Sequence, residues 1–84
     1  MKYVYFVWYS YEYEDINDID VVAEGKLAAY VRKMIDDERI YDESINEFRE
    51  KTGKDFPEND EEAIDLLKID VWDIKKQYVF GSED

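Results

Sequence analysis

Hydrophobic and polar positions divide the chain into six segments, and the first gives the strongest strand signal. Residues 2–13 are β-branched or aromatic almost throughout and contain neither Gly nor Pro. The period of a strand places a row of odd-numbered residues on one face: Tyr3, Tyr5, Val7, Tyr9, Tyr11 and Tyr13. The other face is apolar at Val4, Phe6 and Trp8 and then turns polar. We therefore expect this strand to begin in the middle of a sheet and to run out into solvent.

The second segment can be assigned in two ways. Asn17-Asp18 favours a turn, after which residues 19–23 can return along the first strand. Gly25 then separates this short strand from a helix over about 25–37. In the alternative the helix begins earlier, because apolar residues also recur at helical spacing, at Ile16, Ile19, Ala23, Leu27, Tyr30 and Met34. The glycine favours the strand.

A second helix is predicted by its end signals. Asp42 is a preferred N-cap residue with Glu43 in the first turn, and Gly53 suits the left-handed position that follows a helix. Its expected inner face is Tyr41, Ile45 and Phe48. Residues 54–57 form a connector.

The remaining chain predicts a third helix and a last strand. Asn59 with Glu62 three residues later indicates a capping box for a helix at 60–68. Its inward residues are Ile64 and Leu67. Residues 69–80 then alternate as a strand, except for a slip near residues 75–76 that predicts a bulge.

These segments predict an α+β domain of order β-β-α-α-α-β. It spans residues 1–80, and residues 81–84 form a frayed tail because they lack an apolar anchor. The first and last strands lie side by side in a small antiparallel sheet, and about three helices cover one face. A competing arrangement drops the second strand. Two strands alone are marginal, and their exposed edge would invite pairing with a second copy or a partner.

Charge narrows the class of partner. The 84 residues include 23 acids and 11 bases, which gives a net charge of −12. Such a chain repels nucleic acids and anionic membranes, so we expect a basic protein surface as partner. An aromatic content of 17% indicates a folded chain in spite of that charge. No apolar stretch is long enough to span a membrane, and we expect a soluble, cytoplasmic protein.

Composition also argues against catalysis. The chain has no Cys and no His, which removes the thiolate nucleophile, the imidazole base and the usual zinc ligands. A calcium loop that starts at Asp15 fails, because its fifth position is Ile19 and its twelfth is Lys26. With Gly only at three scattered positions, no phosphate loop is present. We expect no enzyme activity, no metal and no cofactor.

The acids form two blocks, and these carry the functional hypothesis. Residues 12–24 hold six acids and no base, and residues 36–65 hold thirteen acids against four bases. One interpretation is that these acids form a solvated surface that keeps a small protein soluble. The functional hypothesis is that their carboxylates take the place of nucleic-acid phosphates on the surface of a basic partner. The candidate partner-binding residues are Tyr11, Glu12, Tyr13, Glu14, Asp15, Asp18, Asp20, Asp36, Asp37, Glu38, Asp42, Glu43 and Glu47.

Tyr11 and Tyr13 are the expected anchors, because tyrosine beside acid suits Arg and Lys surfaces. The competing interpretation of the tyrosine row is core packing under the helices.

In size, acidity and aromatic richness the chain is similar in character to small phage-encoded inhibitors of nucleic-acid machinery. These include anti-restriction proteins, anti-CRISPR proteins and uracil-DNA glycosylase inhibitors. The similarity is one of composition and implies a DNA-mimic inhibitor. The alternative is a structural or adaptor domain that forms a homodimer, or binds one protein, through a strand edge and apolar or tyrosine contacts. Salt should weaken the first kind of binding and not the second.

Overall fold

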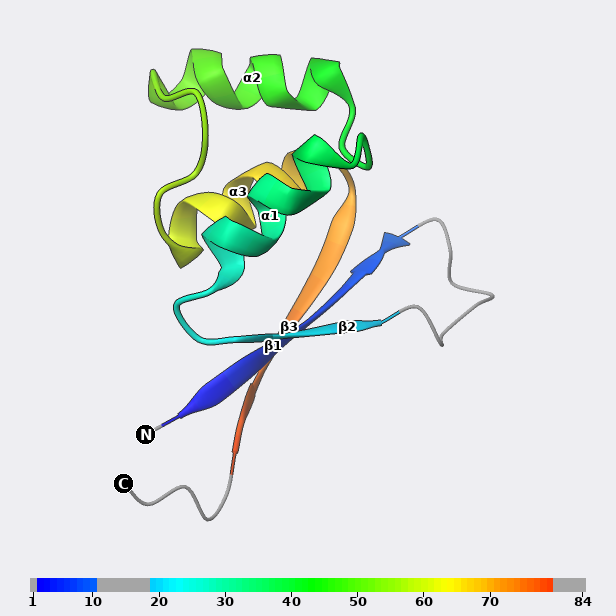
Figure 1. The fold of residues 1–84 in the computed structure, drawn as a ribbon, viewed down its shortest axis with the longest axis vertical. Coiled ribbons are helices and arrows are strands. Elements are labelled where there is room, and N and C mark those ends of the chain that lie inside the picture. Colours follow the sequence, from blue (N-terminus) through cyan, green and yellow to red (C-terminus); the bar gives the residue numbers. More distant parts are fainter. Residues whose placement is uncertain (1, 11–18, 80–84) are drawn as a thin grey trace.

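The computed structural model describes residues 2–10 and 19–79 (Figure 1). Its elements are β1 (Tyr3–Tyr9), β2 (Asp20–Ala23), α1 (Leu27–Asp36), α2 (Asp42–Thr52), α3 (Asp60–Ile69) and β3 (Trp72–Tyr78). This order confirms the predicted α+β fold. The predicted tail at 81–84 lies outside the described residues.

The three strands form one antiparallel sheet in the order β2-β1-β3. Val7 of β1 lies opposite Asp20 of β2, and Tyr9 lies opposite Trp72 of β3. The first and last strands are therefore adjacent, as predicted. Because Asp20–Ala23 is a strand, the two-strand arrangement and the early helical start are both wrong. All three helices lie on the same side of the sheet (Figure 1).

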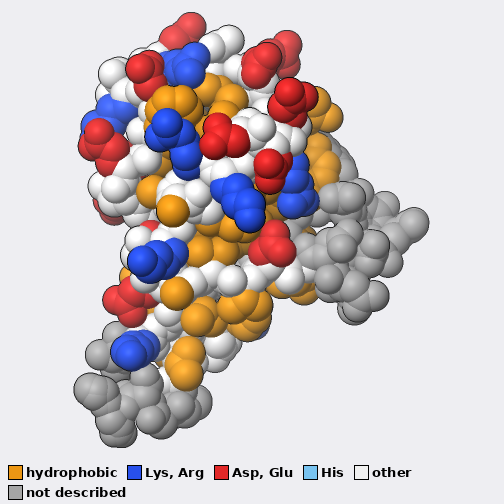
Figure 2. All heavy atoms as spheres, in the orientation of Figure 1, with side chains coloured by type: hydrophobic (Ala, Val, Ile, Leu, Met, Phe, Trp, Pro, Cys, Tyr) orange, Lys and Arg blue, Asp and Glu red, His pale blue; other side chains and the backbone are white. Residues whose placement is uncertain are grey.

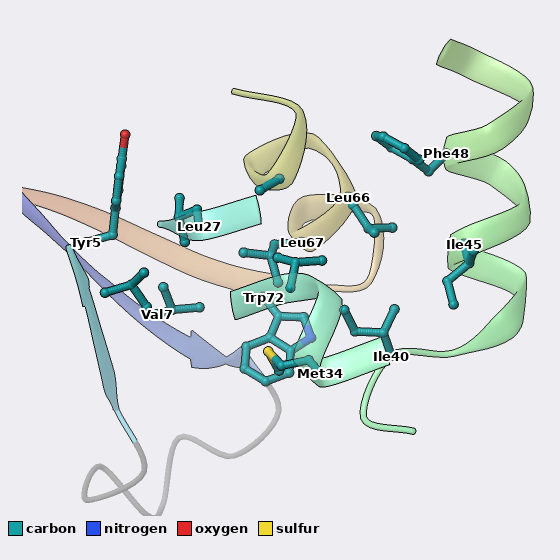
Figure 3. Close-up of a cluster of buried hydrophobic side chains, with 13 residues drawn as sticks. Tyr5, Val7, Leu27, Met34, Ile40, Ile45, Phe48, Leu66, Leu67 and Trp72 are labelled. Carbon is teal, nitrogen blue, oxygen red and sulfur yellow. The ribbon is translucent and has the colours of Figure 1, made fainter. Parts of the chain in front are cut away.

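One part of the core lies between the sheet and the helices that pack on it, and another part, with Ile45, Phe48 and Leu66, lies between α2 and α3 (Figure 3). Its buried members are Tyr5, Val7, Val22, Leu27, Val31, Met34, Ile40, Ile45, Phe48, Ala63, Leu66, Leu67 and Trp72. Tyr3 and Tyr9 pack against it partly buried. The described part of the tyrosine row therefore belongs to the core, as the core-packing interpretation of this row predicts. Tyr11 and Tyr13 lie outside the described residues.

The last strand begins later than predicted and lacks the predicted bulge. Ile69 belongs to α3, and β3 begins at Trp72. The pairing of β1 with β3 runs without a break from Tyr3–Tyr78 to Tyr9–Trp72, so the predicted bulge is wrong. The slip in alternation arises because Lys76 lies on the apolar side, where its Nζ is 4.0 Å from the centroid of the Tyr3 ring.

The start of α2 also differs from its prediction. The N-cap residue is Tyr41, whose side chain makes no cap hydrogen bond, and Asp42 is the first helical residue. Tyr41 is 67% exposed and not on the inner face. Ile45 and Phe48 are buried and Gly53 has φ of 75°, as predicted.

Of the two hydrogen bonds of the predicted capping box at α3, one is present. Asn59 Oδ1 accepts a hydrogen bond from the Glu62 backbone N at 2.9 Å. The Glu62 side chain accepts from the backbone N of Glu58 instead of from that of Asn59, also at 2.9 Å. Leu67 is fully buried and Ile64 is partly buried against the core, in agreement with the predicted inner face.

Candidate functional site

Five of the predicted acids gather where α1 ends and α2 begins. We call this set the acidic corner: Asp36, Asp37, Glu38, Asp42 and Glu43. All five are exposed, and none takes part in an ion pair within residues 2–10 and 19–79. Figure 2 shows acidic side chains over the helical half of the molecule with Lys and Arg among them. Among the described residues, the corner therefore presents carboxylates that are not in ion pairs.

The helix dipoles stabilise some of these acids and destabilise others. Asp42 and Glu43 lie in the first turn of α2, where the positive end of the helix dipole favours a carboxylate. Asp36 and Asp37 lie at the C-terminal end of α1, where the same dipole disfavours one. Helix stability accounts for the first pair of acids and not for the second.

Glu38 occupies a strained position in the same corner. Its backbone N donates to Ile35 O, and the N of Arg39 donates to Met34 O, which is the pattern of a Schellman motif. Glu38 has φ of 61°, a left-handed conformation that costs a residue with a Cβ about 1–2 kcal/mol. A glycine at this position would avoid the cost, but the residue present is a glutamate.

We expect Glu38→Gly to stabilise the protein by about 0.5–1 kcal/mol, because relief of the left-handed strain exceeds the extra entropy that glycine loses on folding. Urea unfolding followed by circular dichroism measures the change. Glu38→Ala keeps the Cβ and should give no such gain. If the two variants unfold at the same midpoint, the position is not strained.

Asp20 is the one predicted partner-binding acid of the first block that lies among the described residues. It lines a hollow of about 310 Å³ together with Asp37, Lys33 and Arg39. The fold thus brings one acid from each block to a common site, but two bases share it. The other predicted residues of the first block lie outside the described residues: Tyr11, Glu12, Tyr13, Glu14, Asp15 and Asp18.

The Asp20 carboxylate is held in place from α1. Its Oδ2 accepts a hydrogen bond of 2.5 Å from the Tyr30 hydroxyl. Burial first, and then this hydrogen bond, raises the pKa of Tyr30 above the usual tyrosine range. Tyr30 therefore stays a neutral donor, and Asp20 is committed to a contact within the fold.

Glu47 is the predicted acid that the structure separates from the corner. It lies farther along α2, with its Oε2 3.7 Å from Lys51 Nζ. It lines a second hollow, of about 570 Å³, between α2 and α3, with Lys68 and Phe48 among its neighbours. Unlike the acids of the corner, Glu47 is paired with a base on its own helix.

A buried carboxylate fixes the corner to the rest of the fold. Asp70 is 2% exposed and lies in the turn between α3 and β3. Its Oδ1 accepts hydrogen bonds from Ser44 Oγ at 2.5 Å and from Tyr41 N at 3.2 Å, and its Oδ2 accepts from Trp72 Nε1 at 3.0 Å. The first turn of α2 is thereby tied to the start of β3.

A second structural acid caps α1 from a distance. Lys26, the N-cap residue of α1, makes no side-chain cap bond. Asp60 of α3 accepts from the backbone N of Gly25 at 2.7 Å and of Leu27 at 3.1 Å. The same carboxylate, after burial and the hydrogen bond to Tyr3, contributes to a raised pKa of Tyr5. This contact joins residues about 35 positions apart, and sequence reasoning missed it.

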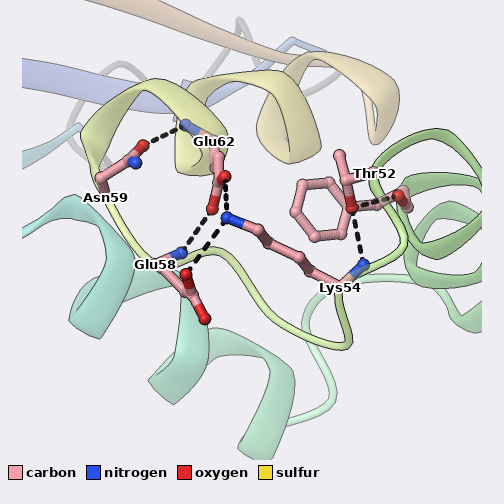
Figure 4. Close-up of polar contacts among 6 residues, drawn as sticks. Thr52, Lys54, Glu58, Asn59 and Glu62 are labelled. Carbon is pink, nitrogen blue, oxygen red and sulfur yellow. Dashed lines mark hydrogen bonds and ion pairs between the residues drawn. The ribbon is translucent and has the colours of Figure 1, made fainter.

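At the other end of the helical layer the acids are paired (Figure 4). Lys54 Nζ lies 2.6 Å from Glu62 Oε2 and 3.1 Å from Glu58 Oε1. The hydrogen bonds to Glu62 and then Glu58 raise the pKa of Lys54. The hydrogen bond from Lys54, followed by the one from the Glu58 backbone, lowers the pKa of Glu62. The unpaired acids of the corner contrast with this cluster.

The hydroxyl groups of the described serines and threonines donate hydrogen bonds within the fold. Their acceptors are Asp73, Asp70 and the carbonyl of Phe48. Within the described part, no group of three or more acidic side chains is placed to hold a metal ion. None of the helices there is long and apolar enough to cross a membrane.

Comparison with protein-family models, curated proteins and solved structures found no match to this chain.

Proposed function

We propose that this chain is a non-enzymatic binding module whose acidic corner blocks a basic, nucleic-acid-binding surface on a partner protein. The observation that supports it is the placement of Asp36, Asp37 and Glu38. These three acids are exposed and lie outside the described ion pairs, at a helix end that disfavours them. Holding these acids at the C-terminal end of a helix costs the fold free energy. Contact with a basic partner would stabilise the same carboxylates.

The proposed mechanism is electrostatic. Carboxylates at a rigid helix–loop–helix corner occupy positions that phosphates take on the partner, and steer the encounter through the net charge of −12. Asp42 and Glu43 extend the same surface onto α2. The protein would then be an inhibitor of the anti-restriction, anti-CRISPR or DNA-repair-inhibitor class. Such a role is consistent with a phage source and a cytoplasmic site of action.

Open acidic surface has a consequence for stability. The ion pairs of the described residues use three bases, Arg49, Lys51 and Lys54. Because many acids therefore repel one another unscreened, the melting temperature should rise with ionic strength. Thermal melts in a salt series test this. A flat or falling series would show that the acids are already neutralised within the fold.

Capture of a partner tests the function. The immobilised protein is incubated with a bacterial lysate and eluted in steps of salt, with duplex DNA as a competing eluent. We expect one dominant nucleic-acid-binding protein, released by salt and by the DNA. A partner that resists both eluents and lacks a basic cleft would contradict the proposal.

A second candidate function is an adaptor that pairs through a strand edge. It is favoured by β3, which ends the sheet and carries Tyr78 48% exposed. Lys75 and Lys76 disfavour pairing of two β3 edges, since like charges would lie close together. Binding of this kind should hold or tighten in high salt, which distinguishes it from the first proposal.

A further inference from the structure

The sheet face that points away from the helices is apolar along its middle. Val4, Phe6 and Trp8 of β1 alternate with the core residues of that strand; they are half-buried and do not belong to the core. On the neighbouring strand Val21 is 61% exposed. We call this surface the open face, defined by Val4, Phe6, Trp8, Val21, Asp73 and Lys75. The helices all lie on the opposite side of the sheet (Figure 1).

The strand register orders the open face into rungs. Phe6 lies between Val21 of β2 and Lys75 of β3. Trp8 lies opposite Asp73, and so forms the next rung with an acid in the place of the lysine. Lys75 is exposed and has no ion-pair partner within residues 2–10 and 19–79. Two successive rungs thus carry an aromatic ring each, with a positive charge beside one and a negative charge beside the other.

We propose that the open face binds the open face of a second copy of this chain. The two-fold axis lies between the two sheets and crosses the strands at the level of Val7. Rotation about it reverses the strand direction and exchanges the two rungs. Phe6 then lies over the partner's Trp8, and Lys75 lies over the partner's Asp73.

Charge complementarity favours a second copy as the occupant. The face matches itself only because the lysine and the acid occupy equivalent places on successive rungs. Aligned sheets pack about 10 Å apart with strands about 30° from parallel, a gap that a lysine side chain can span. Two chains of charge −12 repel over most of their surface, and this face, where Lys75 offsets Asp73, permits approach.

The interface does not involve the acidic corner, which lies among the helices. It therefore goes beyond the proposed function, and either can fail alone. Because screening reduces repulsion between the copies while apolar contact persists, self-association should strengthen from about 0.01 M to about 1 M salt. Binding of a basic partner at the corner should weaken over the same range.

Sedimentation of the full chain over a concentration series tests the proposal. The wild type should form a dimer, and Asp73→Lys and Lys75→Asp should each weaken self-association at least about tenfold, because like charges then meet across the axis. An equal mixture of the two variants should recover association to within about threefold of the wild type, since a positive pair then faces a negative pair. Recovery in the mixture excludes misfolding as the cause.

Two controls complete the experiment. Lys68→Asp makes the same charge change on α3 and should leave the dimer intact, whereas Trp8→Ala should abolish it with the circular dichroism spectrum retained. The proposal is overturned by a wild type that stays monomeric at both salt extremes. It is equally overturned by single variants that associate like the wild type, or by a mixture no stronger than its components.

Discussion

Asp70→Ala is expected to lower the free energy of unfolding by about 3–5 kcal/mol. Asp70 is 2% exposed and accepts three hydrogen bonds. Its removal leaves the buried Trp72 indole N–H and the partly buried Tyr41 N–H without this acceptor, and a buried donor left unsatisfied costs about 1–3 kcal/mol. Chemical unfolding followed by circular dichroism measures the loss.

Asp65→Ala is the matched control, because Asp65 is an exposed acid of α3 that makes no hydrogen bond in the described residues. It should change stability by no more than about 0.5 kcal/mol. Two variants of equal stability would show that the buried carboxylate does not hold α2 to the turn before β3.

Phe48→Ala is expected to cost about 3–5 kcal/mol. Phe48 is fully buried and is the largest side chain that α2 places in the core, near Leu66 (Figure 3). Its loss leaves a cavity between α2 and α3 and weakens the support of Asp42 and Glu43. Thermal and urea unfolding measure the effect.

Phe48→Leu keeps most of the buried volume and should cost only about 1 kcal/mol. The gap between the two variants isolates the contribution of the aromatic ring. If Phe48→Ala costs no more than Phe48→Leu, α2 does not depend on this contact for its position.

Element order was predictable because its signals are local. The alternation of residues 2–10, Gly53 after α2 and Asn59 before α3 each act within a few residues of the chain. The bulge prediction failed because Lys76 packs against Tyr3, a contact across strands that alternation does not encode. Tyr41 was placed inside for its apolar ring, but its backbone is bound by Asp70 and its ring is exposed.

The candidate site could be predicted only where it is continuous in sequence. Asp36, Asp37 and Glu38 stay together because they follow one another at a helix end. Asp60 was counted in the second acidic block and Asp70 was given no role, and both proved to be acceptors for distant donors. For Asp70 a signal existed, since an acid between Ile69 and Val71 interrupts an apolar run. For Asp60 no local pattern indicates a helix cap across 35 positions.

The most direct test of the acidic corner is a comparison of two triple charge reversals. One variant changes Asp36, Asp37 and Glu38 to Lys, which the dipole of α1 favours, so the fold should persist. The control changes Glu50, Asp55 and Asp65 to Lys, with the same change in net charge away from the corner.

Affinity for the captured partner is measured for both variants at low salt. The corner variant should lose at least about a hundredfold in affinity, and the control should lose little, because close charge pairs contribute more than net charge. Equal affinities for the two variants would contradict a binding surface at the acidic corner.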